Sequence, residues 1–251
     1  MPKIPPIYSE RFDIPCYMFD CSTALRPHAV MDIAQELAAK GSKQIGATDA
    51  DLAPHGLVWI LARMRVHFYD APHRLDSVTA QTWHRGLQGP FFLRDYSLLG
   101  EDGATRVGAT SSWVLMDVEK RSLLRGDHAQ EIVPSGAQNS AAAISGPQNT
   151  AEKVAVPKEV VMEKAGEHTV SYSDLDYNGH ANNAKYVLWA SDVLPVEMLR
   201  ERGVSDFTVN FNREAHLGDT LQLLWGASSD VFFIEGRFAD GAQAFVCKFV
   251  F

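Results

Sequence analysis

The spacing of apolar residues predicts one helix in each half of the chain. In the first half, an apolar stripe at helical spacing follows Pro27, which suits an early helix position, and ends before Gly46, which can stop the helix. The stripe consists of Val30, Ile33, Leu37, Gly41 and Ile45. In the second half, residues 186–194 are apolar almost all round, as expected of a buried helix, and a further short helix is expected at 196–202.

Strands are recognised by their content of β-branched and aromatic residues. They are expected at 8–18, 57–70, 76–87, 91–99 and 104–118, and again at 167–173, 205–213, 219–228, 231–239 and 242–251. Each half would then hold one strand, one helix and four further strands. One buried helix wrapped by an antiparallel sheet is the hot-dog architecture, so we expect an α+β protein with a tandem (double) hot-dog fold. Two fused copies can supply within one chain the pairing that single hot-dog domains obtain by dimerising.

A repeated pattern of residues relates the two halves. The segment RVHFYDAPHRLDSVTAQTW in the first half aligns with TVNFNREAHLGDTLQLLWG in the second. The aligned pairs, each 143 positions apart (209 − 66 = 143), are Val66 with Val209, Phe68 with Phe211, His73 with His216 and Asp76 with Asp219. Asp-Gly-Ala at 102–104 and again at 240–242 predicts a hairpin in each half. Several matches in the same order favour duplication.

The segment between the halves has the composition of a linker. Residues 134–152 are rich in Ser, Ala, Gly, Pro, Gln and Asn and show no apolar period. The length of this segment favours a domain boundary over a surface loop. We therefore expect an N-terminal hot-dog domain at 1–133, a linker at 134–155 and a C-terminal hot-dog domain at 156–251.

Charge and cysteine content narrow the possible functions. The formal charge of 23 − 31 = −8 argues against nucleic acid as the main partner, because phosphate binding needs a surplus of Lys and Arg. The three cysteines, Cys16, Cys21 and Cys247, are too few for a disulfide framework and show no metal-site spacing. No apolar run has the length of a signal peptide or of a membrane span. We expect a cytoplasmic protein without a membrane partner.

The stretch SYSDLDYNGHANNAKYVLWAS, residues 171–191, holds the most informative polar side chains. Asp176, Asn178 and His180 alternate just ahead of the buried helix, so extended backbone would place all three on one face. The unpaired N–H groups of the helix N-terminus that follows can stabilise negative charge. Taken singly, each side chain is more typical of a turn or a helix cap. Together they are the parts needed for attack on a thioester carbonyl.

The whole segment resembles the acyl-acyl-carrier-protein (acyl-ACP) thioesterases of plants and bacteria, whose pattern is Asp-x-Asn-x-His-x-Asn-Asn-x-x-Tyr. The matching residues are Asp176, Asn178, His180, Asn182, Asn183 and Tyr186. LVWILARMRVHFYDAP, VTAQTW, LRDYSLL and SSWVLMD resemble the N-terminal hot-dog domain of the same family. In FNREA, Glu214 matches the family's catalytic Glu, and Ala215 stands where plant members have Cys. The resemblance implies hydrolysis of fatty acyl-ACP to free fatty acid and holo-ACP.

The catalytic residues expected on this basis are Asp176, Asn178, His180 and Glu214. No Gly-x-Ser-x-Gly elbow occurs and no cysteine belongs to the motif, so carboxylate chemistry remains. In this hypothesis Asp176 or Glu214 activates water or attacks directly, and backbone N–H groups at the start of the helix stabilise the oxyanion. Asn178 positions the water or the carboxylate, and His180 orients or polarises the site. The three cysteines are expected to act as buried small hydrophobes.

The first half is expected to shape the substrate pocket rather than to take part in the chemistry. The frame set by the helices places Cys21, Thr23 and Leu25 opposite the three motif residues, so that half has lost the catalytic set. The family resemblance implies that it forms the acyl tunnel. Candidates for lining the tunnel, for each of which core packing is at least an equal alternative, are Trp59, Met64, Trp83 and Trp113.

The partners follow from the same resemblance. Acyl carrier protein is the expected partner, and the basic cluster Lys120, Arg121 and Arg125 could meet its acidic surface. We expect a monomer or a homodimer. No cofactor or metal ion is expected, because the nine histidines lack the close spacing of a zinc motif and no glycine-rich phosphate loop follows a strand.

Three alternative functions stay open. An acyl-CoA thioesterase would use the same fold and much of the same motif. An enoyl-thioester hydratase of the hot-dog type uses an Asp-x-Asn-Pro-x-His pattern, whereas the spacing here is one residue shorter and lacks the proline. A non-catalytic acyl-thioester binding module would have no need of the intact Asp, Asn, His and Glu set.

Overall fold

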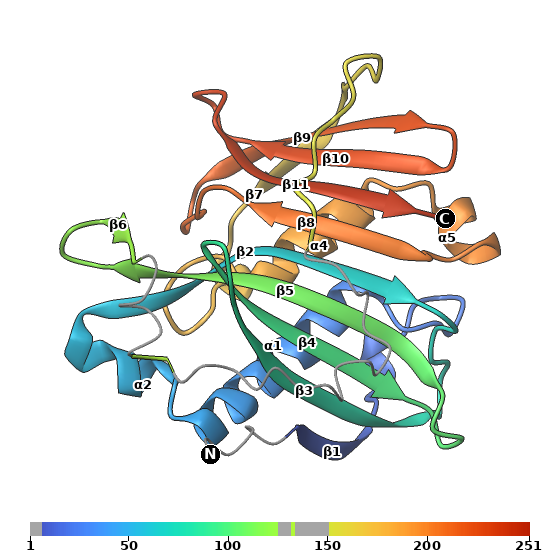
Figure 1. Cartoon of the computed structure of the whole chain (residues 1–251). Coiled ribbons are helices and arrows are strands. Elements are labelled where there is room, and N and C mark those ends of the chain that lie inside the picture. The colour runs from blue at the N-terminus through green and yellow to red at the C-terminus, as the bar shows by residue number, and fades with distance from the viewer. Residues whose placement is uncertain (1–6, 125–131, 134–150) are drawn as a thin grey trace. The chain divides into compact units, whose positions relative to one another are not determined.

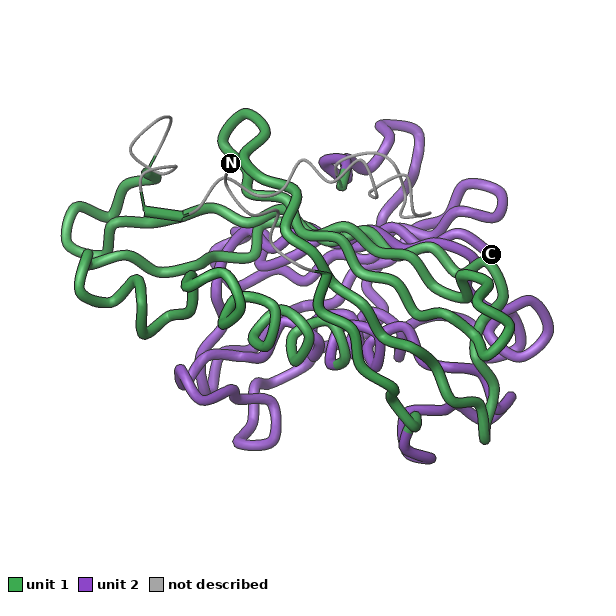
Figure 2. Tube along the Cα trace, turned by 60° about the horizontal axis from the view of Figure 1, so that its bottom comes forward, with its two compact units in different colours: residues 1–14, 33–151 green, residues 15–32, 152–251 purple. Residues whose placement is uncertain are grey.

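The computed structural model describes residues 7–124, 132–133 and 151–251. The chain divides into two compact units, drawn in different colours in Figure 2. Unit 1 comprises residues 1–14 and 33–151, and unit 2 comprises residues 15–32 and 152–251. The domains predicted from the sequence, 1–133 and 156–251, differ from these units because they assign residues 15–32 to the first half. The domain boundaries therefore stay a prediction. The predicted linker lies outside the described residues except at its C-terminal end, 151–155.

Unit 1 is an antiparallel sheet packed against the later turns of helix α1 (Figure 1). Its elements are β1 (Tyr8–Asp13), α1 (Pro27–Ile45, of which the first turns belong to unit 2), α2 (Asp49–Leu52), a 3-10 turn (Ala53–His55), β2 (Leu57–Phe68), β3 (Ser77–Gln88), β4 (Phe91–Leu99), β5 (Thr105–Asp117) and β6 (Ser122–Leu123). The strands pair in the order β1-β3-β4-β5-β2, and β6 pairs with β5. The predicted strand at 8–18 ends at Asp13, because Pro15 leads into a 3-10 turn.

Unit 2 repeats this arrangement. Its elements are a 3-10 turn (Cys16–Met18), β7 (Glu163–Thr169), a 3-10 turn (Tyr172–Asp174), α4 (Asn183–Asp192), α5 (Val196–Glu201), β8 (Asp206–Phe211), β9 (Thr220–Ser228), β10 (Val231–Arg237) and β11 (Gln243–Val250). The strand order β7-β9-β10-β11-β8 matches that of unit 1 strand for strand. This shared topology supports the predicted duplication. None of the helices within the described ranges is both long and apolar enough to cross a membrane.

Helix α4 supplies the core of unit 2. Its buried residues are Ala184, Tyr186, Val187, Trp189 and Ala190. The Tyr186 ring makes edge contacts with Phe211 of β8 and Phe245 of β11, at centroid distances of 5.7 and 5.4 Å. Such pairs add about 0.5–1.5 kcal/mol beyond area burial. Gly236 of β10 leaves room for Phe245, because a Cβ there would overlap the Phe245 ring. This packing fixes the position of the Tyr186 ring, whose hydroxyl contacts the candidate site described below.

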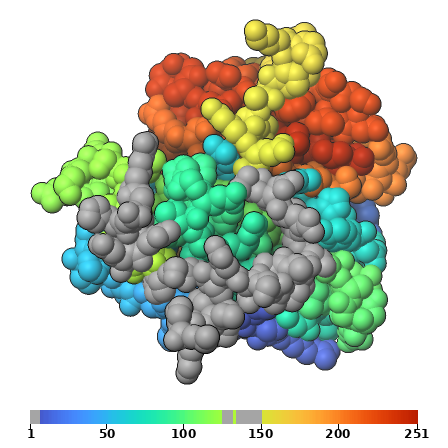
Figure 3. Space-filling model, in the orientation of Figure 1, coloured from blue at the N-terminus to red at the C-terminus, as the bar shows by residue number. Residues whose placement is uncertain are grey.

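The other face of the unit 2 sheet is covered by the segment that precedes β7. Val154 and Val160 pack against Phe233 of β10 and Val246 of β11. In Figure 3 this segment, in yellow, lies across the orange and red strands. Val154 belongs to the predicted linker but is only 8% exposed. The C-terminal end of that linker is therefore part of the core of unit 2.

The helix-facing side of the unit 1 sheet carries a buried arginine. Arg94 of β4 donates from Nη2 to Ser42 Oγ at 3.1 Å and from Nη1 to Thr82 Oγ1 at 3.4 Å. Burial lowers the pKa of Arg94. A Cβ at Gly41 would lie 2.5 Å from Arg94 Nη1, which explains the glycine within the apolar stripe of α1. The space between α1 and the unit 1 sheet therefore contains polar groups around Arg94.

Candidate active site

Two loops of unit 2 meet at the start of α4. One loop joins β7 to α4 and carries the Asp-x-Asn-x-His motif, and the other joins β8 to β9 and carries Glu214. A bridge pairs His180 with His216, and the Ala181 N–H donates to the Ala215 carbonyl at 2.9 Å. The pairing brings His180 beside Glu214, which lies 34 positions away in the sequence (214 − 180 = 34).

Residues 176–180 form a tight turn instead of the predicted extended segment. Asp176 Oδ1 accepts hydrogen bonds from the N–H groups of Asn178 at 2.8 Å and of His180 at 3.3 Å. The Asp176 N–H donates to the His180 carbonyl at 2.8 Å, and Gly179 takes a φ of +80°. The expectation that the alternate side chains share one face is therefore wrong, because the aspartate side chain accepts hydrogen bonds from backbone N–H groups two and four residues later and so closes a turn.

The first half contains the same turn, one residue away from the predicted register. Asp20 Oδ1 accepts hydrogen bonds from the N–H groups of Ser22 at 2.8 Å and of Ala24 at 3.0 Å. The corresponding pairs, 156 positions apart (176 − 20 = 156), are Asp20 with Asp176, Ser22 with Asn178 and Ala24 with His180. The predicted correspondence of Cys21, Thr23 and Leu25 to the motif is wrong. The first half retains the aspartate but has neither the asparagine nor the histidine.

The loop between β8 and β9 is held on both sides of Ala215. The Ala215 N–H donates to the buried Tyr186 hydroxyl at 2.9 Å. The His216 N–H donates to Asp219 Oδ2 at 2.8 Å. Ala215 is fully buried, whereas Glu214 and His216 on either side of it are exposed. Alternate residues of an extended segment share a face, so Glu214 and His216 point the same way.

His180 and Glu214 face each other across the two loops. His180 Nδ1 lies 3.6 Å from Glu214 Oε2, and the two side chains are 35% and 58% exposed. The His216 ring lies edge-on to the His180 ring at a centroid distance of 4.8 Å. Asn178 is exposed at the tip of the turn. In the sequence His216 stands out only as a repeat position, and nothing there marks it as a neighbour of His180.

Two N–H groups in the first turn of α4, those of Ala184 and Lys185, are engaged inside the protein. Asn182 is the N-cap, and its Oδ1 accepts a hydrogen bond from the Ala184 N–H at 2.8 Å. The Lys185 N–H donates to the Asn182 carbonyl at 2.9 Å. The expectation that the helix end offers free donors is wrong for these two groups, because the cap residue satisfies them. The side chains of Asn178 and His180 are therefore the better candidates to polarise a carbonyl oxygen.

A buried carboxylate that the sequence analysis missed supports the motif loop. Asp174 Oδ2 accepts hydrogen bonds from the Ser171 N–H and hydroxyl, both at 2.9 Å, and lies 3.0 Å from His168 Nε2. Burial raises the pKa of Asp174, but these hydrogen bonds lower it by more, so the pKa lies below its ordinary value. The Asp174 carbonyl accepts a hydrogen bond from the Asn182 N–H at 2.8 Å. The Ser171-x-x-Asp174 capping spacing is the sequence signal that could have found it.

Only one of the three cysteines is buried. Cys247 is inaccessible to solvent, and burial raises the pKa of its thiol. Cys16 and Cys21 are exposed, and Cys21 Sγ accepts a hydrogen bond from Arg200 Nε at 3.4 Å. The expectation of buried cysteines is therefore wrong for these two. Neither of the loops that carry His180 and Glu214 contains a cysteine.

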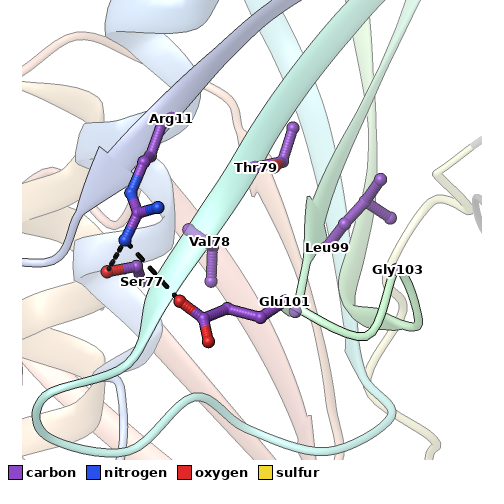
Figure 4. Close-up of a pocket in the computed structure, with 8 residues that line it drawn as sticks. Arg11, Ser77, Val78, Thr79, Leu99, Glu101 and Gly103 are labelled. Carbon is purple, nitrogen blue, oxygen red and sulfur yellow. Dashed lines mark hydrogen bonds and ion pairs between the residues drawn. The ribbon is translucent and has the colours of Figure 1, made fainter.

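A pocket described in unit 1 has a different character. It lies between β1, β3 and the β4–β5 hairpin and is shown in Figure 4. Arg11 spans its mouth, donating to Ser77 Oγ at 3.2 Å and lying 3.6 Å from Glu101 Oε1. The residues that line it include none of the four predicted catalytic residues. An open pocket bounded by exposed charges does not suit an acyl chain.

The two helix-and-sheet units, with the same strand order, form a tandem hot-dog fold, and the His180–Glu214 pair lies beside the start of α4 in the second unit. A family model described as the acyl-ACP thioesterase N-terminal domain matches residues 5–132, and a model described as the C-terminal domain of the same thioesterase matches residues 158–238. The chain belongs to the acyl-ACP thioesterase family. The predicted family and the predicted fold class are both confirmed.

Plant enzymes are among the relatives. The chain is 25% identical to oleoyl-acyl carrier protein thioesterase 1, chloroplastic, of Arabidopsis thaliana, over 94% of this chain and 68% of that protein. It is also 25% identical to a chloroplastic dodecanoyl-[acyl-carrier-protein] hydrolase of Umbellularia californica, over 89% of this chain but only 63% of that protein. The chain therefore spans about two thirds of the length of these plant relatives.

Solved structures share the fold over nearly the whole chain. An acyl-ACP thioesterase from Bacteroides thetaiotaomicron superposes with a TM-score of 0.85 at 19% identity, covering 97% of each chain. The 12:0-ACP thioesterase from Umbellularia californica gives a TM-score of 0.78 at 20% identity, covering 97% of this chain and 96% of that chain. At such identities the likeness establishes the fold alone.

Proposed function

We propose that this protein hydrolyses fatty acyl-ACP thioesters to free fatty acid and holo-ACP. The observation that carries the proposal is the His180–Glu214 pair, 3.6 Å apart and open to solvent, beside the turn built by Asp176. Family membership supports the same reaction class. The related plant proteins are named for oleoyl-ACP and dodecanoyl-ACP. These names support a fatty acyl chain of medium or long length, saturated or unsaturated, as the substrate.

The chemistry follows from the side chains in the two loops. A water molecule adds to the thioester carbonyl carbon, and Glu214 or Asp176 accepts a proton from that water. Asn178 and His180 polarise the carbonyl oxygen and stabilise the negative charge that develops on it. The C–S bond then breaks, and the thiolate leaves and takes up a proton. Direct attack by a carboxylate, followed by hydrolysis of the mixed anhydride, is the alternative order of events.

The carrier is tested with matched thioesters. Acyl-ACP and acyl-CoA of the same chain length should be supplied separately, and free thiol and free fatty acid should both be measured. We expect a higher kcat/KM with acyl-ACP. A higher value with acyl-CoA would assign the protein to the CoA branch, and release of neither product would contradict a thioesterase.

The three free cysteines support a reducing compartment, and we propose the cytoplasm.

Thiol-blocking reagents provide one test of the carboxylate mechanism. Cys16 and Cys21 are exposed and should be modified in the folded protein, whereas the buried Cys247 should not. We expect no loss of turnover, because no cysteine lies in either catalytic loop. Mass spectrometry of the modified protein, with an activity assay on the same sample, makes the measurement. Inactivation that substrate protects against would show that a thiol takes part.

Chain-length preference tests the role proposed for the first half. In unit 1 the Trp59 ring packs edge-on against Phe92 at 5.2 Å and Trp113 at 6.4 Å, next to a buried apolar cluster. If this region lines the acyl pocket, Trp59→Ala should raise kcat/KM for long chains relative to short ones by about tenfold, since a pocket discriminates by about 1–3 kcal/mol per methylene.

The matched control for this variant is Trp225→Ala in unit 2, where Trp225 stacks on Phe232 at 6.0 Å. The ratio of kcat/KM across a series of saturated acyl lengths should stay unchanged in this control. Equal shifts in both variants, or a shift in the control alone, would make the first half a structural partner and contradict the assignment of the pocket to it.

A further inference from the structure

Three potential metal ligands converge at the candidate site. The ligand atoms of His180, Glu214 and His216 all lie within 4.8 Å of one another. Two of these residues flank the buried Ala215 and share one face, and the third faces them from the paired loop. Nothing in the spacing along the sequence shows this group, because one ligand comes from a loop 34 positions earlier (214 − 180 = 34).

The backbone beneath the three side chains is fixed while the side chains themselves can adjust. The Ala215 N–H and carbonyl are both engaged, with Tyr186 and Ala181 respectively, at 2.9 Å. A tetrahedral zinc site with bonds of about 2.1 Å needs ligand atoms roughly 3.4 Å apart. His180 Nδ1 and Glu214 Oε2 are already 3.6 Å apart. The remaining ligand atoms are within 4.8 Å, and the exposed side chains of Glu214 and His216 can rotate to shorten these distances.

The surrounding charge also favours a cation. Burial raises the pKa of Tyr186 to about 12, the hydrogen bond from the Ala215 N–H lowers it, and the nearby carboxylates of Glu214, Asp176 and Asp219 add smaller increases. Three carboxylates therefore act on one buried hydroxyl at the base of this group. A surface region with excess negative charge raises the local concentration of cations.

We propose that His180, Glu214 and His216 bind a divalent transition-metal ion of the zinc type. Two imidazoles and one carboxylate are the ligand set that Zn²⁺, Co²⁺ and Ni²⁺ prefer, whereas Mg²⁺ and Ca²⁺ take oxygen ligands. The fourth position would be open to water. If the proposed thioesterase function is correct, the bound ion occupies Glu214 and His180 and inhibits hydrolysis reversibly.

The test measures metal binding directly as well as activity. Zn²⁺ is titrated calorimetrically into the full chain carrying Cys16→Ser and Cys21→Ser, so that exposed thiols do not bind it, with excess Mg²⁺ present. We expect one site. His216→Ala should weaken binding by tenfold or more, since even residues behind the ligands cost about 10–100-fold in affinity.

The chain itself offers the matched control. His73 occupies the same turn in the first half, where its N–H donates to Asp76 Oδ2 at 2.8 Å, as His216 does to Asp219. Ala71 stands there in place of Glu214, so the ligand set is incomplete. His73→Ala should leave both zinc affinity and turnover unchanged. Thermal melting of each variant without metal checks that the fold is intact.

The outcomes separate the metal site from the proposed function. Zinc affinity that is equal in the parent and in His216→Ala, or absent from both, would overturn the metal site, whatever the enzyme activity. The metal site is supported if binding depends on His216 and if hydrolysis by the His73→Ala control is inhibited over the same zinc range as the parent. Binding that depends on His216 but leaves hydrolysis untouched would support the metal site and contradict the placing of catalysis at His180 and Glu214.

Discussion

Replacement of Glu214 by Gln should lower kcat on acyl-ACP by about a hundredfold or more while leaving the melting temperature nearly unchanged. The side chain of Glu214 is 58% exposed, so its charge contributes little to folding. Its carboxylate faces His180 Nδ1 at 3.6 Å, where it can accept a proton from water or hold the imidazole in place. Gln keeps the shape of the side chain but cannot accept that proton. Steady-state kinetics and thermal melting on the same preparations make the measurement.

The control for this variant is Glu163→Gln, a change of the same kind at an exposed position on β7. It should leave both kcat and KM at the parent values. Turnover of Glu214→Gln close to that of the parent would remove Glu214 from the chemistry and leave Asp176 as the carboxylate that acts. A large fall in the melting temperature would show a structural role that the exposed position does not suggest.

Replacement of Asp176 by Asn should also lower kcat by about a hundredfold or more, with little change in stability. The amide oxygen of Asn can accept the hydrogen bonds from the N–H groups of Asn178 and His180, so the turn should be kept. What is lost is the carboxylate charge. Asp176→Ala loses the turn as well, and should cost about 1 kcal/mol of unfolding free energy in addition to turnover. Kinetics and denaturant titration of the two variants separate the chemical role from the structural one.

The duplicated turn provides the control for Asp176. Asp20 makes the same pair of hydrogen bonds in the first half, at 2.8 and 3.0 Å, but Ala24 replaces the histidine there. Asp20→Asn should therefore leave turnover unchanged, and Asp20→Ala should lower stability alone. If Asp176→Asn keeps nearly full activity, Asp176 serves only to shape the turn that presents His180, as Asp20 shapes its counterpart.

The fold could be predicted from the sequence because its signals are local and periodic. The apolar stripe before Gly46 predicted α1, which ends at Ile45, and the β-branched segments predicted the strands. Element ends were harder to place. The strand expected at 8–18 stops at Asp13, since a proline-led turn interrupts the backbone hydrogen bonds. The buried end of the expected linker, Val154, could not be foreseen because its burial depends on β10 and β11.

The local conformation at the site could be predicted only in part. The alternation of Asp176, Asn178 and His180 fits an extended strand, but an aspartate with a glycine three residues later equally fits a turn. The structure has the turn, in which Asp176 Oδ1 accepts hydrogen bonds from the backbone N–H groups of Asn178 and His180. The expected register of the first half, which follows from the frame of the two helices, is displaced by one residue, to Cys21 instead of Asp20.

The sequence by itself determined the family, the tandem fold and the identity of the four candidate residues, because each depends on residue types at fixed spacing. Only the tertiary structure decided which of these residues meet. His180 and Glu214 come together because two loops pair beside α4, with the Tyr186 hydroxyl holding one of them. His216 joins them through the same pairing. Contacts between distant segments depend on strand register and packing, and a linear spacing carries no record of either.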